Sequence, residues 1–551
     1  MQKFDVIIAG SGACGGWACM ALAQNGFKVA LVEAGSHIEP FRDFHHQWPY
    51  QLPFRGAGQP GYLRRYHRGA TEYNYRIMID DADNPYTTPP DKPFRWLRSR
   101  VLGGRTLHWS RASDRFSDLE FKAASRDGYG EDWPISYADI APYYDRVERF
   151  IGVSAAPANL PQFPDGVFLA PMPLNCAETI FSAAAQKIGF PATPRRVAQL
   201  TRTWNNRPPC HYCGNCVNGC DVGAMFSTVS TTLPPALKTG NVTLLCDSVV
   251  SHVLMNKENR ASGVRYVERY TNRSVEIGAS VVVLAGSSLE NTRLLLNSAN
   301  GGLANSSGVL GKYLMDQIGG ADVTGFLPPL KDTPIRNDDG KAGGLYIPNF
   351  TNIGPKPGSS GFIRGYAMSA SGGAALFPAF ASGLAGFGSS YKKQVNLLYP
   401  AAARVWLSGG EMLPRKDNFV ELDANVRDKW GIPVLKITCT HCDNDRRLYN
   451  DFFARAQELF RAARGEIVDA KPYLSPPGSL IHEVGTSRMG NDAKTSVLNS
   501  FCQTHDIPNL FVFGGGCFVT TGDKHPTLTM MALTARGCDL LVDLARKGDM
   551  A

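Results

Sequence analysis

A strand that runs into a glycine-rich turn and then a helix constrains the fold of this chain more than any other feature. The apolar run FDVIIA, residues 4–9, leads into GSGACG, which contains Gly10, Gly12 and Gly15. At such a turn the backbone can approach a pyrophosphate closely, and the N-terminus of the next helix faces its charge. With a helix expected over residues 14–25, the motif predicts a dinucleotide-binding unit.

An acidic residue completes this unit. A second strand is expected over residues 28–33, and it ends at Glu33, roughly 20 residues after the first glycine. A carboxylate at this point accepts a hydrogen bond from the adenosine ribose of a bound dinucleotide. The unit alone does not separate NAD from FAD.

Later segments extend the same architecture. An apolar run over 280–285 with a helix over 289–297, and a C-terminal helix over 528–541, are typical of a parallel sheet. Alternating patterns at 419–422 and 434–438 favour antiparallel strands. We therefore expect an α/β protein with an α+β second domain: a Rossmann-like FAD-binding domain with a parallel sheet, and a substrate domain built on an antiparallel sheet.

The length of 551 residues exceeds what one core usually supports, so two joined domains are expected. The FAD-binding domain should cover 1–320, with a cysteine-rich insert near 205–225. The substrate-binding domain should cover 321–479, and 480–551 should return to the first domain with the catalytic histidines.

Charge and hydropathy exclude several classes of protein. The net charge of +8 is not gathered into a basic run, so no nucleic-acid partner is expected. The uncharged stretch 365–391 is diluted by glycine and serine, which favours a loop in the second domain over a membrane span. The N-terminus begins directly with the first strand, so neither a signal peptide nor a transmembrane segment is expected.

Four blocks resemble the glucose-methanol-choline (GMC) oxidoreductase family. They are VEAG at 32–35, VLGGRTLHWS at 101–110, AGSSLENTRLLLNS at 285–298 and HEVGTSRMG at 482–490. The resemblance implies an enzyme that oxidises CH–OH groups with FAD. It implies that FAD contacts Gly10, Gly12, Gly15, Glu33, Gly103, Gly104, His108 and Trp109.

Two histidines match the family's catalytic positions. His482 opens the H-x-x-G-T pattern, and His525 stands before Pro526 at the second position. Alcohol oxidation by hydride transfer needs a base for the hydroxyl proton, and imidazole titrates near neutral pH. The alternative for His525 is that it only satisfies a loop carbonyl.

His108 belongs to a second resemblance. The spacing of Gly103, Gly104, His108 and Trp109 matches the G-G-x-x-x-H-W pattern of pyranose oxidases, in which this histidine is bonded covalently to the flavin. The residues between, RTL, depart from that group. Covalent attachment through His108 and a non-covalent histidine beside the flavin ring therefore both stay open.

Four cysteines are clustered in CHYCGNCVNGC: Cys210, Cys213, Cys216 and Cys220. The spacing C-x2-C-x2-C-x3-C is typical of an iron–sulfur cluster, although Asp221 replaces the usual following proline. A structural zinc site, and two disulfides or free thiols, are the alternatives. The stretch resembles the insert of bacterial sugar dehydrogenases of the glucoside 3-dehydrogenase type, which implies a [3Fe-4S] cluster.

These features predict an FAD-dependent dehydrogenase that converts a sugar or glycoside to the keto sugar or lactone. Electrons would leave through the cluster to a cytochrome or quinone. The resemblance implies cytochrome c as acceptor and co-export to the periplasm with a small signal-bearing subunit; a cytoplasmic enzyme is the alternative. A sugar oxidase that uses oxygen, and a redox protein without turnover, are the rival functions.

Overall fold

The computed structural model describes residues 2–44, 74–214, 216–334, 343–354, 360–373 and 379–548. Its strands are β1 (Lys3–Ala9), β2 (Val29–Val32), β3 (Thr193–Pro194), β4 (Val242–Leu245), β5 (Ser248–Met255), β6 (Ala261–Glu268), β7 (Ser274–Leu284), β8 (Val323–Phe326), β9 (Leu345–Ile347), β10 (Tyr366–Gly372), β11 (Ala402–Gly410), β12 (Phe419–Arg427), β13 (Pro433–Thr438), β14 (Glu466–Asp469) and β15 (Leu510–Val512). Its α-helices are α1 (Ala13–Gln24), α2 (Pro40–Asp43), α3 (Asp118–Phe121), α4 (Ala123–Asp127), α5 (Tyr137–Ile151), α6 (Cys176–Lys187), α7 (Leu233–Lys238), α8 (Ser288–Ser298), α9 (Gly388–Leu398), α10 (Asp443–Ala462) and α11 (Thr527–Lys547).

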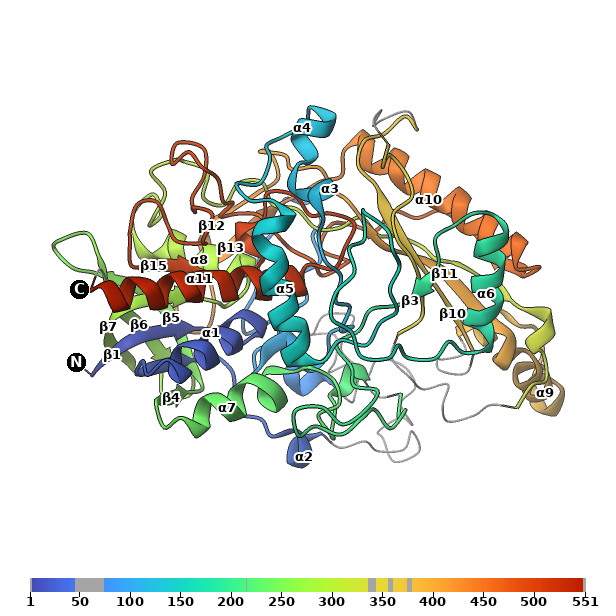
Figure 1. Cartoon of the computed structure of the whole chain (residues 1–551), viewed down its shortest axis with the longest axis horizontal. Helices are drawn as coiled ribbons and strands as arrows, with labels where there is room; N and C mark the ends of the chain where they lie inside the picture. Colours follow the sequence, from blue (N-terminus) through green and yellow to red (C-terminus); the bar gives the residue numbers. More distant parts are fainter. Residues whose placement is uncertain are drawn as a thin grey trace.

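The first sheet of the described residues has seven strands. Its order is β4-β2-β1-β7-β6-β5, and β15 also pairs with β7. The strands β4, β2, β1, β7 and β15 are mutually parallel, whereas β5 and β6 join as antiparallel strands. Helix α1 contacts α7 and α11, and α11 contacts α5, which forms a helical layer against this sheet (Figure 1). The expected Rossmann-like parallel sheet is confirmed.

The second sheet is antiparallel throughout, with the order β14-β8-β11-β10-β9-β3. Helices α6 and α10 contact each other and pack on its strands. Figure 1 shows this sheet and its helices on the opposite side of the molecule from the two chain termini. The expected fold class, with a second sheet that is antiparallel, is thus confirmed. The domain boundaries stay a prediction, and β3 at residues 193–194 joins this sheet from outside the range 321–479.

Two local expectations need correction. The stretch 365–391 was expected to be a loop, but its start forms β10, a central strand buried between β9 and β11. Its small residues suit close packing, since a Cβ on Gly372 would meet the backbone of Ala402 and the side chain of Ala177. The alternating runs at 419–422 and 434–438 do pair antiparallel, but they form their own two-stranded ribbon, β12–β13, against α8.

The core of the first sheet explains why its strands form. Val6, Ile7 and Ile8 of β1 are fully buried, as expected for a strand covered on both faces by other elements. Among the described residues, no helix is both long enough and apolar enough to cross a membrane.

Candidate active site

One cavity of about 660 Å³ joins the glycine turn to the two histidines. Its wall includes Gly10–Cys14 and Glu33, and also His482 and His525. Residues 248–251, 285–288 and 513–515 line it as well, so the start of β5 and the segments that follow β7 and β15 contribute. Such a cavity suits a long ligand that reaches from the turn to the histidines.

The glycine turn leaves room for such a ligand. Gly10 has φ +104°, and a Cβ there would strike the backbone of Ala285, so only glycine fits. A Cβ on Gly15 would strike the carbonyl of Gly10. A Cβ on Gly12 would meet nothing within 4 Å, because Gly12 faces open space at the N-terminus of α1. The turn therefore fits the pyrophosphate of a dinucleotide.

Glu33 is tied to both glycine-rich segments through Ser11. The Ser11 hydroxyl donates to Glu33 Oε2 at 2.5 Å and accepts from the backbone N–H of Gly103 at 2.9 Å. The Gly35 N–H donates to Glu33 Oε1 at 2.7 Å, and burial raises the pKa of this carboxyl. Gly103, with φ +89°, begins the short 3₁₀ turn Gly104–Leu107. The two segments that the sequence assigns to the cofactor are thus joined by direct contacts.

His482 is oriented by Gln317. The amide nitrogen of Gln317 donates to the carbonyls of Gly522 and Lys524 at 2.8 and 2.7 Å. Its oxygen must then face His482 Nδ1, 2.7 Å away, and it accepts the Nδ1 proton. Among the described residues, none hydrogen-bonds Nε2 of His482, so the unprotonated nitrogen is the free one.

His525 has partners on both nitrogens. Asp114 Oδ2 lies 2.9 Å from Nδ1, and Arg195 Nη2 lies 2.7 Å from Nε2. Because a guanidinium only donates, Nε2 of His525 accepts and Nδ1 donates to Asp114. His525 therefore bonds two charged side chains, and the interpretation that it only satisfies a loop carbonyl does not describe this arrangement.

The two imidazoles form an edge-to-face pair, with ring centroids 5.0 Å apart and an angle of 81° between planes. Burial lowers the pKa of each histidine, and Arg195 lowers both further. The proximity of His525 adds to the effect on His482. Both rings are consequently neutral at pH 7, which a proton acceptor requires.

Two acidic residues hold the His482 segment. Asp316 accepts from the backbone N–H groups of His482 and Leu480 at 2.9 and 3.1 Å. Burial, reinforced by Glu483, raises the pKa of Asp316 to about 7. Arg105 donates to Glu483 Oε2 at 2.8 Å, which links this segment to the 3₁₀ turn.

His108 and Trp109 lie on the wall of the same cavity. His108 Nε2 is 2.6 Å from the Ser99 hydroxyl, and burial lowers its pKa to about 4. The indole N–H of Trp109 donates to the Phe226 carbonyl at 3.0 Å. The structure thus brings His108 and both C-terminal histidines to one cavity; covalent attachment of flavin stays a prediction.

The cysteine-rich loop lies apart in sequence from the segments that carry the histidines. All thirteen cysteines are free thiols, so the disulfide alternative is not what the structure contains. The Cys210 sulfur accepts from Gln199 Nε2 at 2.7 Å and from the Tyr212 N–H at 3.4 Å. Burial raises the pKa of Cys210, and Cys216 and Cys220 raise it further.

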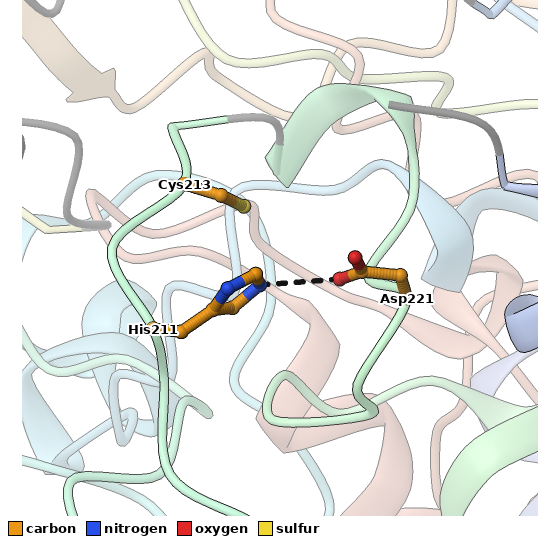
Figure 2. A group of neighbouring side chains, drawn as sticks. All are labelled: His211, Cys213 and Asp221. Carbon is orange, nitrogen blue, oxygen red and sulfur yellow. Dashed lines mark hydrogen bonds and ion pairs between the residues drawn. The ribbon is translucent and has the colours of Figure 1, made fainter. Parts of the chain in front are cut away.

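Cys213 has different neighbours. It forms a group with His211 and Asp221 whose potential ligand atoms lie within 4.8 Å of one another, and His211 Nε2 is 3.2 Å from Asp221 Oδ1 (Figure 2). Among the described residues, no three of the four clustered cysteines are gathered as tightly as this group. The thiols therefore do not form an evident four-cysteine cage.

Sequence reasoning missed the residues that orient the histidines. Gln317, Asp114 and Arg195 are single residues far from the histidines in sequence, and none belongs to a motif that would single it out. Only the fold brings them together.

Comparisons with known proteins agree on one family. The GMC oxidoreductase family models match residues 4–319 and 414–534. A 2-methyl-1,2-propanediol dehydrogenase from Mycolicibacterium austroafricanum is 30% identical, over 98% of this chain and 95% of its own length. A fructose dehydrogenase large subunit from Gluconobacter japonicus is 26% identical over 99% and 98%. A solved pyridoxine 4-oxidase from Mesorbium loti has the same fold, with a TM-score of 0.61, 16% identity, and coverage of 97% and 98%.

Proposed function

The chain belongs to the GMC oxidoreductase family. Because its relatives in this family are named dehydrogenases and oxidases that act on alcohol groups, we propose that it is an FAD-dependent dehydrogenase of a sugar or glycoside. The hydroxyl oxidised is a secondary or an anomeric one, and the product is the keto sugar or lactone. The similarity to a fructose dehydrogenase large subunit supports a sugar substrate.

The observation that carries this proposal is the orientation of His482. Gln317 accepts its Nδ1 proton, so the lone pair on Nε2 is available to a ligand in the cavity. His525 lines the same cavity. Nε2 takes the substrate hydroxyl proton, and the low pKa keeps this nitrogen unprotonated at neutral pH. His525, held on Nδ1 by Asp114, would position the same hydroxyl through Nε2 in place of its present bond with Arg195.

The residues present fit FAD. Gly10, Gly12 and Gly15 would hold the pyrophosphate, Glu33 the ribose, and the turn from Gly103 to Trp109 would contact the flavin. When bound, FAD supplies the hydride acceptor. The protein encloses the reacting end, since His525 and Arg195 are only 5% and 8% exposed, and this limits access of water.

The cysteine-rich loop is proposed as the exit for electrons. Cys210, Cys216 and Cys220, with Cys213, would hold an iron–sulfur cluster of the [3Fe-4S] type, from which a cytochrome c or a quinone takes electrons. The thiolate donor set and its spacing support this proposal; the separate environment of Cys213 does not. A partner subunit is part of the proposal, because one relative is itself a large subunit. We further propose that the two subunits are exported together to the periplasm.

An oxygen-using sugar oxidase is the second candidate, favoured by the G-G-x-x-x-H-W spacing that ends at His108 and Trp109. One experiment separates the two. Purified protein is mixed with a panel of sugars and glycosides without oxygen, and the loss of flavin absorbance identifies a substrate. The same substrate is then oxidised in air. Stoichiometric hydrogen peroxide would favour the oxidase, and efficient reduction of cytochrome c with little peroxide would favour the dehydrogenase.

A further inference from the structure

Arg195 is a buried cation whose described partners are all neutral. It follows β3 directly, is 8% exposed and lines the cavity. It donates to His525 Nε2 at 2.7 Å and to the Ser408 hydroxyl at 3.1 Å, while its Nε has no hydrogen-bond partner. No carboxylate of the described residues lies within 4.0 Å of its guanidinium, in contrast to Arg98 and Arg293 in the same cavity.

Two further arginines line the same cavity as Arg195. Arg111, 5% exposed, donates to the Trp109 carbonyl at 2.5 Å, and it too has no described carboxylate within 4.0 Å. Arg404 is 3.2 Å from Asp322 but leaves its Nε without a partner. Burial lowers the pKa of Arg195 most. Asp114 and Tyr346 raise it, whereas Arg111 and Arg404 lower it, so the three positive charges repel one another. Only Asp322 pairs directly with any of the three in the described structure.

Strand β11 places Arg404 beside an aromatic side chain that also lines the cavity. Arg404, Trp406 and Ser408 alternate along β11, and all three line the cavity. On a strand such residues share one face, whereas Val405, which lies between Arg404 and Trp406, is fully buried. The guanidinium of Arg404 lies 4.5 Å from the Trp406 ring centre, so an aromatic face and a cation meet at one place.

We propose that Arg111, Arg195 and Arg404 bind the carboxylate of an acidic sugar, so that the substrate is a sugar acid or a uronide. The inference rests on the proposed function and defines its substrate class. Asp114 reaches Arg195 only through His525. A carboxylate bound directly to these guanidiniums would therefore further reduce the cost of burying them. The planar fork of arginine also suits a carboxylate bound by two parallel hydrogen bonds.

The position of the three arginines indicates that the proposed ligand is a substrate carboxylate and not a phosphate of the cofactor. The pyrophosphate belongs to the glycine turn at the start of α1, whereas Arg195 bonds His525, one of the two catalytic histidines. A carboxylate bound to Arg195 would also compete with His525 Nε2 for the Arg195 guanidinium. That nitrogen would then be free for the substrate hydroxyl.

The test compares matched substrates on the FAD-loaded enzyme. Methyl glucoside and methyl glucuronide differ only in a CH2OH group against a carboxylate, and gluconate against glucitol offers an open-chain pair. We expect kcat/KM to be at least about tenfold higher for the acid of a pair. Arg404→Gln should lower the ratio of acid to neutral kcat/KM by about tenfold, and raised salt should increase KM for the acid only. The control Arg146→Gln should leave the ratio unchanged, because Arg146 pairs with Asp539 of α11 and does not line the cavity.

Three results would overturn the proposal. A higher kcat/KM for the neutral sugar than for its acid would do so. An equal loss of kcat/KM for the acid and the neutral sugar in Arg404→Gln would also do so. Loss of FAD from Arg195→Lys would assign that guanidinium to the cofactor. If no sugar is oxidised at all, the proposed function fails, and calorimetry still decides this inference: the FAD-loaded protein should bind methyl glucuronide, and Arg404→Gln should weaken that binding about tenfold.

Discussion

The side-chain oxygen of Gln317 lies 2.7 Å from Nδ1 of His482, and this contact selects the nitrogen that is free to act as a base. The two carbonyls that accept from the Gln317 amide leave it only one orientation. The tautomer of His482 is therefore set by three backbone and side-chain contacts before any substrate binds.

The first prediction concerns the base. Replacing His482 by alanine should slow flavin reduction by about 100-fold or more, because its Nε2 is unprotonated and has no hydrogen-bond partner among the described residues. Stopped-flow absorbance without oxygen measures the rate, and bound FAD should remain at wild-type level. His505→Ala, which removes a histidine bonded to Ser496, serves as the control. Near-normal reduction would transfer the role to His525.

The second prediction concerns pH. His482 must be neutral to accept a proton, and its pKa lies well below 6.5 because of burial, so activity is lost only as pH falls through that low value. Gln317→Glu places a negative charge beside Nδ1, which raises the pKa of His482. The acid limb of kcat/KM should then move to higher pH.

The control for this change is Gln457→Glu on α10, which should leave the limb in place. Because glutamate cannot donate to Gly522 and Lys524, thermal unfolding must show that the variant is folded. A folded Gln317→Glu protein with an unshifted limb would mean that another group titrates.

The third prediction concerns His108. If the G-G-x-x-x-H-W spacing has the same meaning as in pyranose oxidases, acid-denatured protein should stay yellow, and His108→Ala should release its flavin on the same treatment. Separation of protein from free flavin on a desalting column provides the measurement. Release from the unmodified protein would refute the covalent bond and leave the histidine with its Ser99 contact alone.

The fourth prediction concerns location. Co-export with a signal-bearing subunit should place the enzyme in the periplasmic fraction of its native host only when that subunit is present. Deleting the gene for the subunit should leave the flavoprotein in the cytoplasmic fraction. Full activity there without any partner would contradict the proposal.

The sequence predicted those parts of the fold that depend on local patterns. The glycine turn, β1, α1 and β2 follow from residues adjacent in the chain, and α8 and α11 follow from helical periodicity. The stretch that contains β10 was misinterpreted because its small residues pack between two neighbouring strands that lie far away in sequence. Residue composition alone cannot distinguish this close packing from a loop.

The candidate site divides in the same way. His482 and His525 could be found from the sequence, because His482 begins the H-x-x-G-T pattern and His525 precedes Pro526 at the family's second catalytic position. Gln317 and Arg195 could not, since a glutamine or arginine carries no signal until the fold brings it within 2.7 Å of an imidazole. Tertiary contacts, and not motif residues, thus set the protonation of the site.

The last prediction is that the cysteine-rich loop serves electron exit and not oxidation of the substrate. Cys216 begins the 3₁₀ turn Cys216–Asn218, and Cys210 interacts with it electrostatically. Cys216→Ser should abolish the electron-resonance signal of a cluster, while substrate still bleaches the flavin and a small dye is still reduced. Reduction of cytochrome c should collapse, because the histidine end of the cavity is too enclosed for a protein acceptor.

Cys213→Ser is the matched comparison, because Cys213 stands with His211 and Asp221 while the other three thiols interact. If only three cysteines hold the cluster, this variant keeps the signal and the cytochrome activity. If it loses both, all four are ligands and the loop rearranges on metal binding. A Cys216→Ser protein that loses FAD and precipitates would instead make the cysteines structural, and zinc would become the better interpretation. Unchanged reduction of cytochrome c by Cys216→Ser would exclude the loop as the route for electrons, even if the unmodified protein holds a cluster.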